Sequence, residues 1–464
     1  MSGDFEFERM PIAKAQIETE HRRINMGTPL GGTRSTLDVL DRVESRSMHG
    51  QIPLIWDRAV DYNIFDEFGN KWIDFTSTIF VANIGHSNAH LLHRLKEQIN
   101  HELIASYAYP VNIRAQYMKK LLEFAGPPFE KAFLLSAGTE TTEAAIKLMR
   151  MNGRKLKKRR GGVVVFTGNW HGRTLGAQQL SSNSAQKDWI YSHDPDIFYL
   201  PFPYPWEVDE SSASEFFDSS FKKLEELGVD PVSDICGFML ETFQGWGAFF
   251  YPITFVKRIR EKSSSIGALL CFDEMQAGFA RTGKAFGFQH YGVQSDLICC
   301  GKGMGGGFPL SGVIGRAEIM DLPSVGNMSS THSGNPLACA AGLAVIEEIE
   351  RLDLINKSDA SGNVLEKSLE TLCQEFSNVL RGNYGKGLIR SLVFRDKIRL
   401  SSGRIVDGGL FASEVVNASF QEGVLFVHTG RESIKLGPPL TIPTGAIQEA
   451  VKVLHSSIFR VLNQ

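Results

Sequence analysis

Residues 297–307 read LICCGKGMGGG and contain the clearest indication of the fold. The stretch begins with a short apolar run, places Lys302 just after that run, and ends in a cluster of glycines. A second apolar run, residues 268–272, ends in Asp273 and Glu274. Short apolar runs with polar or glycine-rich exits are typical of strands that are buried on both faces of a parallel sheet. The two runs therefore predict neighbouring strands of an α/β protein.

Lys302 and Asp273 carry the side chains that pyridoxal phosphate chemistry requires. Both follow predicted buried strands, and the carboxyl ends of parallel strands meet at one edge of a sheet. A lysine amine can form an imine with an aldehyde cofactor, and a carboxylate can keep a ring nitrogen protonated. Lys302 could equally be a solvated lysine after a strand, and Asp273 could belong to an acidic helix start. The other motifs of the chain are needed to choose between these interpretations.

Length and composition limit the classes of function. The chain has 464 residues, which is too many for one simple core, so two or more domains are expected. Its net charge of −3 gives no reason to expect nucleic acid as a partner. Its apolar stretches stay short of the ~18 residues that a membrane span needs, and the acidic N-terminus has no apolar signal core. The six cysteines form no C-x-x-C pair, which favours reduced core residues of a cytoplasmic protein over disulfides or metal ligands.

The middle of the chain is predicted to form a doubly covered, mostly parallel sheet. From about residue 90 to 320, helix-like segments alternate with short apolar runs. In such α/β folds, ligand sites gather at the carboxyl ends of the strands. The apolar runs are residues 132–135, 163–166, 237–240, 268–272, 297–300 and 313–314.

Changes of pattern along the chain predict four segments. A β-hairpin is expected over residues 64–75 with its turn at 67–70, because apolar and polar residues alternate around a turn signal. A long helix is expected from Pro336 to about Arg351. The segments are an N-terminal arm or lid (1–50), the first part of a small domain (51–88), a large cofactor-binding domain (89–335), and a linking helix with the C-terminal part of the small domain (336–464).

Further motifs follow the predicted strands or precede helices. Residues 136–140 (SAGTE) lead into a helix whose first N–H groups could bind an anion, although a plain helix cap has the same composition. The tryptophan of residues 170–174 (WHGRT) could stack on a flat heteroaromatic ring or fill a core. Residues 331–336 (THSGNP) could bind a phosphate or cap a helix. Gln276, one helical turn after Asp273, could reach a phenolic oxygen on the same ring.

Taken together, these stretches resemble the class III (ω-aminotransferase type) pyridoxal-phosphate enzymes of fold type I. The resemblance runs from about residue 52 to the C-terminus. It implies a large domain with a mostly parallel seven-stranded sheet covered by helices, and a smaller α+β domain built from both chain ends. It also implies a homodimer with shared active sites. The implied activity moves an amino group from an amine or amino-acid donor to a ketone or aldehyde acceptor by a ping-pong mechanism. The motifs that carry the resemblance are the Gly-containing turn, aromatic-His-Gly-Arg-Thr, Glu-x-x-Gln-Gly, Asp-Glu-x-Gln, Lys, Thr and Pro-Pro-Leu.

The resemblance also implies a role for individual residues. Lys302 would form the Schiff base with the cofactor and shuttle a proton, and Asp273 would pair with the pyridine nitrogen. Ile79 and Phe80 would line the substrate entrance, and the Gly85-His86 pair of the family follows them in the sequence. The other implied cofactor contacts are Gly138 and Thr139 on the phosphate, Trp170 on the ring face, Glu241, Gln276 on the phenolic oxygen, and Thr331 on the phosphate of the neighbouring subunit.

Two departures from the family pattern occur together. Trp246 follows Gln244-Gly245, where members that use glutamate carry a glutamate. Lys435 stands three residues before Pro-Pro-Leu, where those members carry an arginine that grips a carboxylate or pairs with that glutamate. The change predicts a larger or less acidic substrate, although Lys435 could simply have kept the carboxylate. Arg431 or His428 could supply the missing recognition.

Two other classes of function remain open at this point. A racemase, decarboxylase or lyase would need the same Lys302 and Asp273, because these reactions share the cofactor chemistry. A non-catalytic binding protein on this fold is disfavoured, since loss of catalysis would not be expected to spare both residues.

Overall fold

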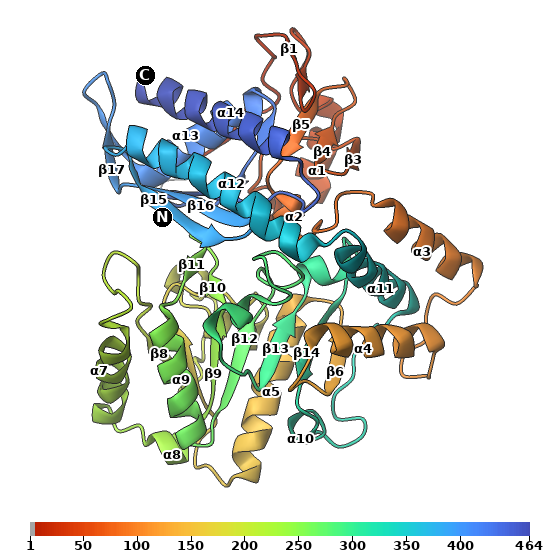
Figure 1. Cartoon of the computed structure of the whole chain (residues 1–464), viewed down its shortest axis with the longest axis vertical. Coiled ribbons are helices and arrows are strands. Elements are labelled where there is room, and N and C mark those ends of the chain that lie inside the picture. The colour runs from red at the N-terminus through yellow and green to blue at the C-terminus, as the bar shows by residue number, and fades with distance from the viewer. Residues whose placement is uncertain (1–4) are drawn as a thin grey trace. The chain divides into compact units, whose positions relative to one another are not determined.

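The structure is a computed structural model that describes residues 5–464. The chain divides into two compact units (Figure 1). Unit 1 contains the residues up to Asn88, residues 246–248 and residues 356–464, whereas unit 2 contains residues 89–245 and 249–355. No helix among the described residues is both long enough and apolar enough to cross a membrane.

Unit 2 is built on a seven-stranded sheet, as predicted. All neighbouring strands run parallel except at β14, which is antiparallel to both of its neighbours. Each of the six predicted runs became a strand; the seventh strand, β8, lies at the edge of the sheet and is only partly buried. The order is β6 (Lys131–Leu135), β14 (Ser311–Gly315), β13 (Leu297–Cys300), β12 (Leu269–Asp273), β9 (Ile235–Glu241), β7 (Gly162–Phe166) and β8 (Ile197–Leu200).

Helices pack on this sheet through continuous apolar faces. The longest of them, α5, buries Ala145, Leu148 and Met149 against the strands. Asn335 caps α11 by accepting hydrogen bonds from the N–H groups of Leu337 and Ala338, which explains why the predicted helix begins at Pro336. The helices of unit 2 are α3 (Ala89–Asn100), α4 (Asn112–Ala125), α5 (Gly138–Lys155), α6 (Leu175–Leu180), α7 (Ala213–Glu226), α8 (Pro231–Asp234), α9 (Ile253–Ser265), α10 (Ala317–Met320) and α11 (Pro336–Arg351). Strands β10 (Phe243–Gln244) and β11 (Phe249–Phe250) form a small hairpin.

Unit 1 combines both ends of the chain in two main sheets. In the first sheet, the C-terminal strand β19 pairs with β5, and the predicted hairpin is confirmed because Ile64 pairs with Trp72. The indole of Trp72 stacks on Phe420 and donates to its carbonyl oxygen, so the core joins the two chain ends. This sheet contains β1 (Ile17–Glu18), β2 (Arg23–Ile24), β5 (Lys71–Asp74), β4 (Asn63–Phe65), β3 (Arg58–Val60) and β19 (Val424–Leu425).

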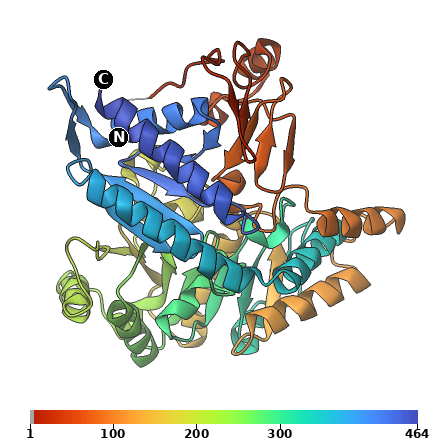
Figure 2. The same ribbon diagram turned by 45° about the horizontal axis from the view of Figure 1, so that its top comes forward.

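The second sheet of unit 1 is antiparallel and carries the C-terminal helices. Helices α12 and α14 lie on the same side of it in both ribbon views (Figure 2). The strands are β15 (Leu380–Lys386), β16 (Ile389–Phe394), β21 (Ser433–Leu436) and β20 (Val427–His428), with β17 (Lys397–Arg399) and β18 (Ile405–Asp407) as a separate pair. The helices of unit 1 are α1 (Arg34–Val43), α2 (Ser77–Phe80), α12 (Leu354–Glu375), α13 (Gly408–Gln421) and α14 (Thr444–Leu462).

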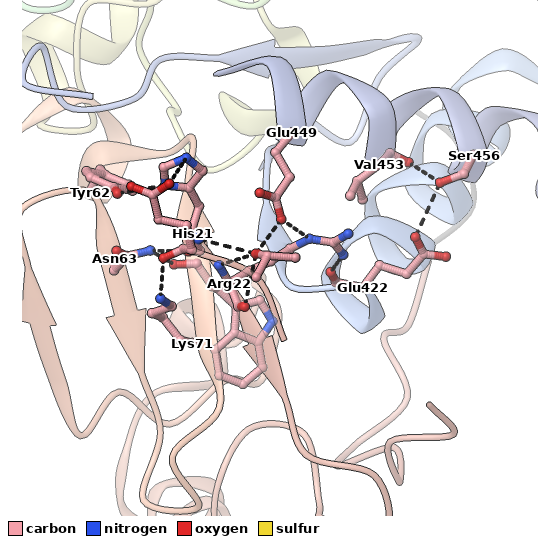
Figure 3. A network of polar contacts seen from close by, with 12 residues as sticks. His21, Arg22, Tyr62, Asn63, Lys71, Glu422, Glu449, Val453 and Ser456 are labelled. Carbon is pink, nitrogen blue, oxygen red and sulfur yellow. Dashed lines mark hydrogen bonds and ion pairs between the residues drawn. The ribbon is translucent and has the colours of Figure 1, made fainter. Parts of the chain in front are cut away.

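A polar network ties the N-terminal segment to the C-terminal helices (Figure 3). Arg22 donates through Nε to Glu449 of α14 at 2.7 Å and also donates to the carbonyl oxygen of Glu422. The ring nitrogen Nδ1 of His21 lies 3.0 Å from the hydroxyl of Tyr62. The residues around β1 and β2, which belong to the expected arm, are therefore fixed within unit 1.

Candidate active site

A cavity of about 300 Å³ lies in unit 2 at the carboxyl ends of the strands. Asp273 ends β12, Glu241 ends β9, and Lys302 follows β13. The lining includes seven of the residues predicted to contact the cofactor: Gly138, Thr139, Trp170, Glu241, Asp273, Gln276 and Lys302. The strand topology thus brings together residues that are more than 160 positions apart in the sequence.

Lys302 has an amine suited to nucleophilic attack. Burial lowers its pKa from the usual value, and the nearby Asp273 and Glu241 oppose that shift. A lowered pKa leaves a larger fraction of the amine unprotonated and able to attack a carbonyl carbon. The backbone of Lys302 has φ +46°, in the left-handed region that non-glycine residues rarely adopt. Such strain is concentrated at functional sites, where the surrounding structure holds it.

Asp273 is held by two hydrogen bonds on its two oxygens. The N–H of Met275 donates to Oδ1 at 3.1 Å, and the ring of His171 donates from Nδ1 to Oδ2 at 2.8 Å. The other ring nitrogen of His171 is buried and has no hydrogen-bond partner among residues 5–464. His171 was not assigned a role from the sequence, although it stands beside Trp170 in the motif that follows β7.

The start of α5 has the form of an anion cradle. Glu140 accepts the N–H groups of Ser136 and Ala137 at 2.9 and 3.0 Å. The next N–H groups, those of Gly138 and Thr139, begin the helix and therefore have no carbonyl of a preceding turn to bind. These donors and the cavity beside them fit the phosphate of a pyridoxal cofactor.

Three glycines allow the segments around the cradle to pack closely together. Gly172 has φ +137°, and a Cβ there would lie 2.4 Å from Oγ1 of Thr139. A Cβ at Gly138 or at Gly301 would lie 2.8 or 2.6 Å from Sδ of Met275, so this side chain fills the space between both backbones. Small residues at these positions allow the backbone to pack closely against the side chains of Thr139 and Met275.

Trp170 presents one face of its indole. The guanidinium carbon of Arg173 lies 4.4 Å from the centre of the ring and covers one face. Only the opposite face can therefore meet a flat heterocycle. The backbone N–H of Trp170 donates to Oε2 of Glu241 at 3.1 Å, which fixes the loop relative to β9. Arg173 lines the cavity as well, and sequence reasoning did not single it out.

Two buried glutamates near the cavity hold their protons more tightly than usual. Burial raises the pKa of Glu241 to about 7, and burial likewise raises the pKa of Glu274 to about 7. Glu274 accepts hydrogen bonds from the hydroxyl of Thr242 and from the N–H groups of Gly287 and Phe288. It supports the loop after β12 and does not line the cavity.

The predicted substrate residues lie in unit 1. The amine of Lys435 is 4.3 Å from the ring centre of Phe80, and the guanidinium carbon of Arg431 is 3.7 Å from a ring centre of Trp246. Ile79 is exposed. Thr331 of unit 2 is exposed and is not part of the cavity lining, and its predicted reach to a neighbouring subunit stays a prediction.

Ile79 and Phe80 belong to a left-handed turn. The four residues Ser77 to Phe80 all have positive φ, between +47° and +68°, although none is glycine. Asp74 accepts hydrogen bonds from the N–H and the hydroxyl of Thr76, both at 2.7 Å. Nε2 of His86 lies 2.7 Å from the other oxygen of Asp74, and the hydroxyl of Ser77 donates to the carbonyl of Gly437 at 2.6 Å. These contacts hold a backbone conformation that costs about 1–2 kcal/mol per residue.

Comparison with known proteins gives a consistent result. The family model described as aminotransferase class III matches residues 45–458. The chain is 33% identical to an acetylornithine aminotransferase of Archaeoglobus fulgidus, over 86% of this chain and 94% of that protein. It is 31% identical to a leucine/methionine racemase of Thermococcus litoralis, over 88% of this chain and 90% of that protein. The fold matches a transaminase from the marine bacterium Virgibacillus with a TM-score of 0.82, at 23% identity, over 92% of this chain and 99% of that chain.

Proposed function

Because this chain belongs to the class III aminotransferase family and is therefore a pyridoxal-phosphate-dependent enzyme, we propose that it works as an aminotransferase through Lys302 and Asp273. It moves an amino group from an amine or amino-acid donor to a ketone or aldehyde acceptor. The observation that supports the proposed roles is that both side chains line the same cavity as Gly138 and Thr139 at the start of α5.

Each residue of the cavity has its own proposed role. When bound, pyridoxal phosphate supplies an aldehyde that takes up the amino group and a ring that withdraws electrons. Lys302 would hold the cofactor through its amine and would move the proton between the substrate carbon and the cofactor carbon. Asp273 holds the proton on the pyridine nitrogen, because a buried carboxylate needs a cationic partner. The aromatic face of Trp170 and the amide of Gln276 orient the ring.

We propose that the working form is a homodimer in which the phosphate site is shared between the subunits. Gly138 and Thr139 bind the phosphate through the start of α5. We propose that Thr331 completes the same site in the neighbouring subunit, because it is exposed in the single chain and lies at a turn before α11. The six free cysteines support a cytoplasmic location, since five of them are buried and none forms a disulfide among residues 5–464.

The substrate pocket should differ from that of glutamate-using relatives. Ile79, Phe80, Trp246 and Lys435 are the proposed substrate contacts. An indole at 246 cannot pair with a cation through charge, and Lys435 is a point charge where a guanidinium would bind in a bidentate way. These two changes support a substrate that is larger or less acidic than a dicarboxylic amino acid.

Racemisation is the second candidate, and the similarity to the Thermococcus racemase favours it over decarboxylation or a lyase reaction. It would use the same Lys302 and Asp273. The two activities differ in the fate of the amino group, because only aminotransfer leaves it on the cofactor.

A donor screen on the loaded enzyme tests the proposal. We expect at least one amino donor to convert the cofactor stoichiometrically to its amine form, measured by absorbance, and a carbonyl acceptor to reverse the change. Borohydride reduction followed by peptide mapping should label the peptide that contains Lys302, and Lys302→Ala should remain unlabelled. Loss of the α-proton without any amine form of the cofactor would favour racemisation, and a label on another peptide would contradict the assignment of Lys302.

A further inference from the structure

A groove with a volume of about 560 Å³ lies in unit 2, at the edge of the sheet opposite the cofactor cavity. Asp296 stands directly before β13, and Arg316 stands directly after β14, which runs antiparallel to β13. Lys302 follows the other end of β13, so this strand separates the groove from the cavity. The volume is within the range of small-molecule sites, and the groove is therefore large enough for a ligand of its own.

The lining of the groove carries more positive than negative charge. Three of its side chains are cations, Lys257, Arg260 and Arg316, and two are carboxylates, Glu261 and Asp296. Lys257, Arg260 and Glu261 share one face of α9, because residues three or four positions apart on a helix are neighbours. The excess of positive charge favours an anion as the ligand.

Asp296 holds the two arginines at the groove. Its Oδ2 accepts from Nη1 of Arg260 at 2.7 Å, and its Oδ1 lies 3.2 Å from Nη2 of Arg316. Oδ2 also accepts the N–H of Leu270 at 2.8 Å, which fixes the carboxylate to β12. One carboxylate cannot neutralise two guanidiniums, which stay charged at physiological pH, so one positive charge is left for a ligand.

Neither guanidinium is saturated by the protein. Nε of Arg316 is buried and has no acceptor among residues 5–464, and Nη1 of the same side chain lies 4.0 Å from Glu318. Arg260 donates through Nε to Ser264 at 3.1 Å and through Nη1 to Asp296, and its Nη2 has no acceptor in the described part of the chain. The N–H groups that remain can donate charge-assisted hydrogen bonds to an oxyanion.

Lys257 adds a cation that no carboxylate offsets. Its side chain is exposed and forms no ion pair among residues 5–464. Glu261, one turn further along α9, pairs with Arg258 at 3.0 Å instead. Uncompensated positive charge therefore lies both on α9 and at the ends of β13 and β14.

We propose that this groove binds the phosphate group of a small, soluble phosphate ester, with Lys257, Arg260 and Arg316 as its contacts. A phosphate dianion offers two negative charges, which match the ammonium and the one guanidinium charge that Asp296 leaves over. A carboxylate monoanion would match only one of them. None of these residues lines the cofactor cavity, so the inference goes beyond the proposed aminotransferase function.

Three variants of the full-length, cofactor-loaded enzyme test this assignment. Arg316→Gln removes one guanidinium and leaves Arg260 in place. Lys257→Gln removes a charge that takes part in no ion pair, so it should not disturb folding. Glu261→Gln removes a negative charge from the groove and should act in the opposite direction. Arg154→Gln is the matched control, because Arg154 is an exposed arginine of unit 2 outside the groove.

Calorimetry measures the binding of inorganic phosphate, glycerol 3-phosphate and acetate at one fixed ionic strength. We expect the wild type to bind both phosphates, and to bind acetate at least about tenfold more weakly. For glycerol 3-phosphate, Arg316→Gln should weaken binding about tenfold and Lys257→Gln about threefold, whereas Glu261→Gln should strengthen it about twofold. Arg154→Gln should leave it unchanged. The absorbance of the bound cofactor should stay constant during each titration, which shows that phosphate does not displace it from the cradle.

The outcomes that would overturn the inference are distinct. One is equal affinity for glycerol 3-phosphate in the wild type, Arg316→Gln and Lys257→Gln, and another is acetate binding as tight as phosphate binding. Weaker binding in Glu261→Gln would also contradict it. Retention of the wild type on phosphatidylcholine vesicles that contain phosphatidic acid, without binding of glycerol 3-phosphate, would assign the groove to a membrane headgroup instead. The donor screen tests the cofactor chemistry and these titrations test the groove, so either proposal can fail without the other.

Discussion

Nδ1 of His171 lies 2.8 Å from Oδ2 of Asp273, and both side chains are buried. The histidine therefore fixes the carboxylate that is proposed to face the cofactor ring. It acts through Asp273, because its other ring nitrogen has no partner among residues 5–464.

Replacing His171 by phenylalanine should leave one oxygen of Asp273 without its donor. We expect the free energy of unfolding of the cofactor-free protein to fall by about 1–3 kcal/mol, the cost of an unsatisfied buried polar group. His171→Asn should recover part of the loss, because its amide can donate from a similar position. Chemical denaturation measures both. The control is His455→Phe, which removes an exposed contact with Glu375 and should change stability by less than about 1 kcal/mol. Equal losses in both proteins would contradict the role of His171.

Gly172→Ala should weaken cofactor binding more than it weakens the fold. Its Cβ would lie 2.4 Å from the hydroxyl oxygen of Thr139, so the start of α5 must shift. Gly228→Ala is the matched control, since Gly228 also has positive φ, +88°, but open space around its Cα. We expect each variant to lose about 1 kcal/mol or more from the backbone conformation, and only Gly172→Ala to lose cofactor on dialysis. Full retention of the cofactor by Gly172→Ala would show that the cradle tolerates the shift.

The stability of the protein should fall as pH rises through the pKa of Glu274. Burial raises this pKa to about 7 in the folded state, above the unfolded value of 4.5. The folded state therefore binds the proton more tightly, so the stabilisation is complete below about pH 4.5 and is lost as pH approaches 7. That loss corresponds to roughly 3 kcal/mol.

The isosteric variant Glu274→Gln tests this dependence. An amide does not titrate, so the variant should show a flatter change of melting temperature between about pH 5 and 8 than the wild type does. Glu123→Gln, on the exposed side of α4, should keep the wild-type slope. The same slope in all three proteins would mean that Glu274 is ionised across this range.

Thr78→Asn should make the protein more stable. Thr78 is exposed and β-branched, with φ +56° and ψ +46° in the middle of the left-handed turn. Asparagine adopts this conformation more readily, so we expect a gain of up to about 1 kcal/mol in the free energy of unfolding. Thr371→Asn, at an exposed position in the right-handed helix α12, should be neutral or slightly destabilising. Destabilisation at position 78 would indicate that the threonine side chain holds the turn.

The residues at the strand ends could be predicted because the pattern around them is local. Lys302 and Asp273 each follow an apolar run, and runs of that kind point to buried parallel strands. Parallel pairing then places their carboxyl ends together, whatever the separation in the sequence. The hairpin over residues 64–75 was predictable for a similar reason, since alternation and a turn are both read from neighbouring residues.

Contacts that depend on the direction of a side chain could not be predicted, because no pattern in the neighbouring sequence indicates them. His171 stands among polar residues, and its partner Asp273 is about a hundred positions away. The left-handed turn at 77–80 lacks the glycine or asparagine that usually marks such a backbone. Arg431 was named only as one of two possible anion binders, because its contact with Trp246 joins segments that are distant in the sequence.

Met275 makes three positions depend on one another. Its sulfur occupies the space that a side chain at Gly138 or Gly301 would need. A homologue or engineered variant with a bulkier residue at either glycine should require a shorter one in place of the methionine. Redesign for a wider cofactor pocket would therefore have to change Gly138, Gly301 and Met275 together. The effect of a substitution at one of these positions should depend on the residues at the other two.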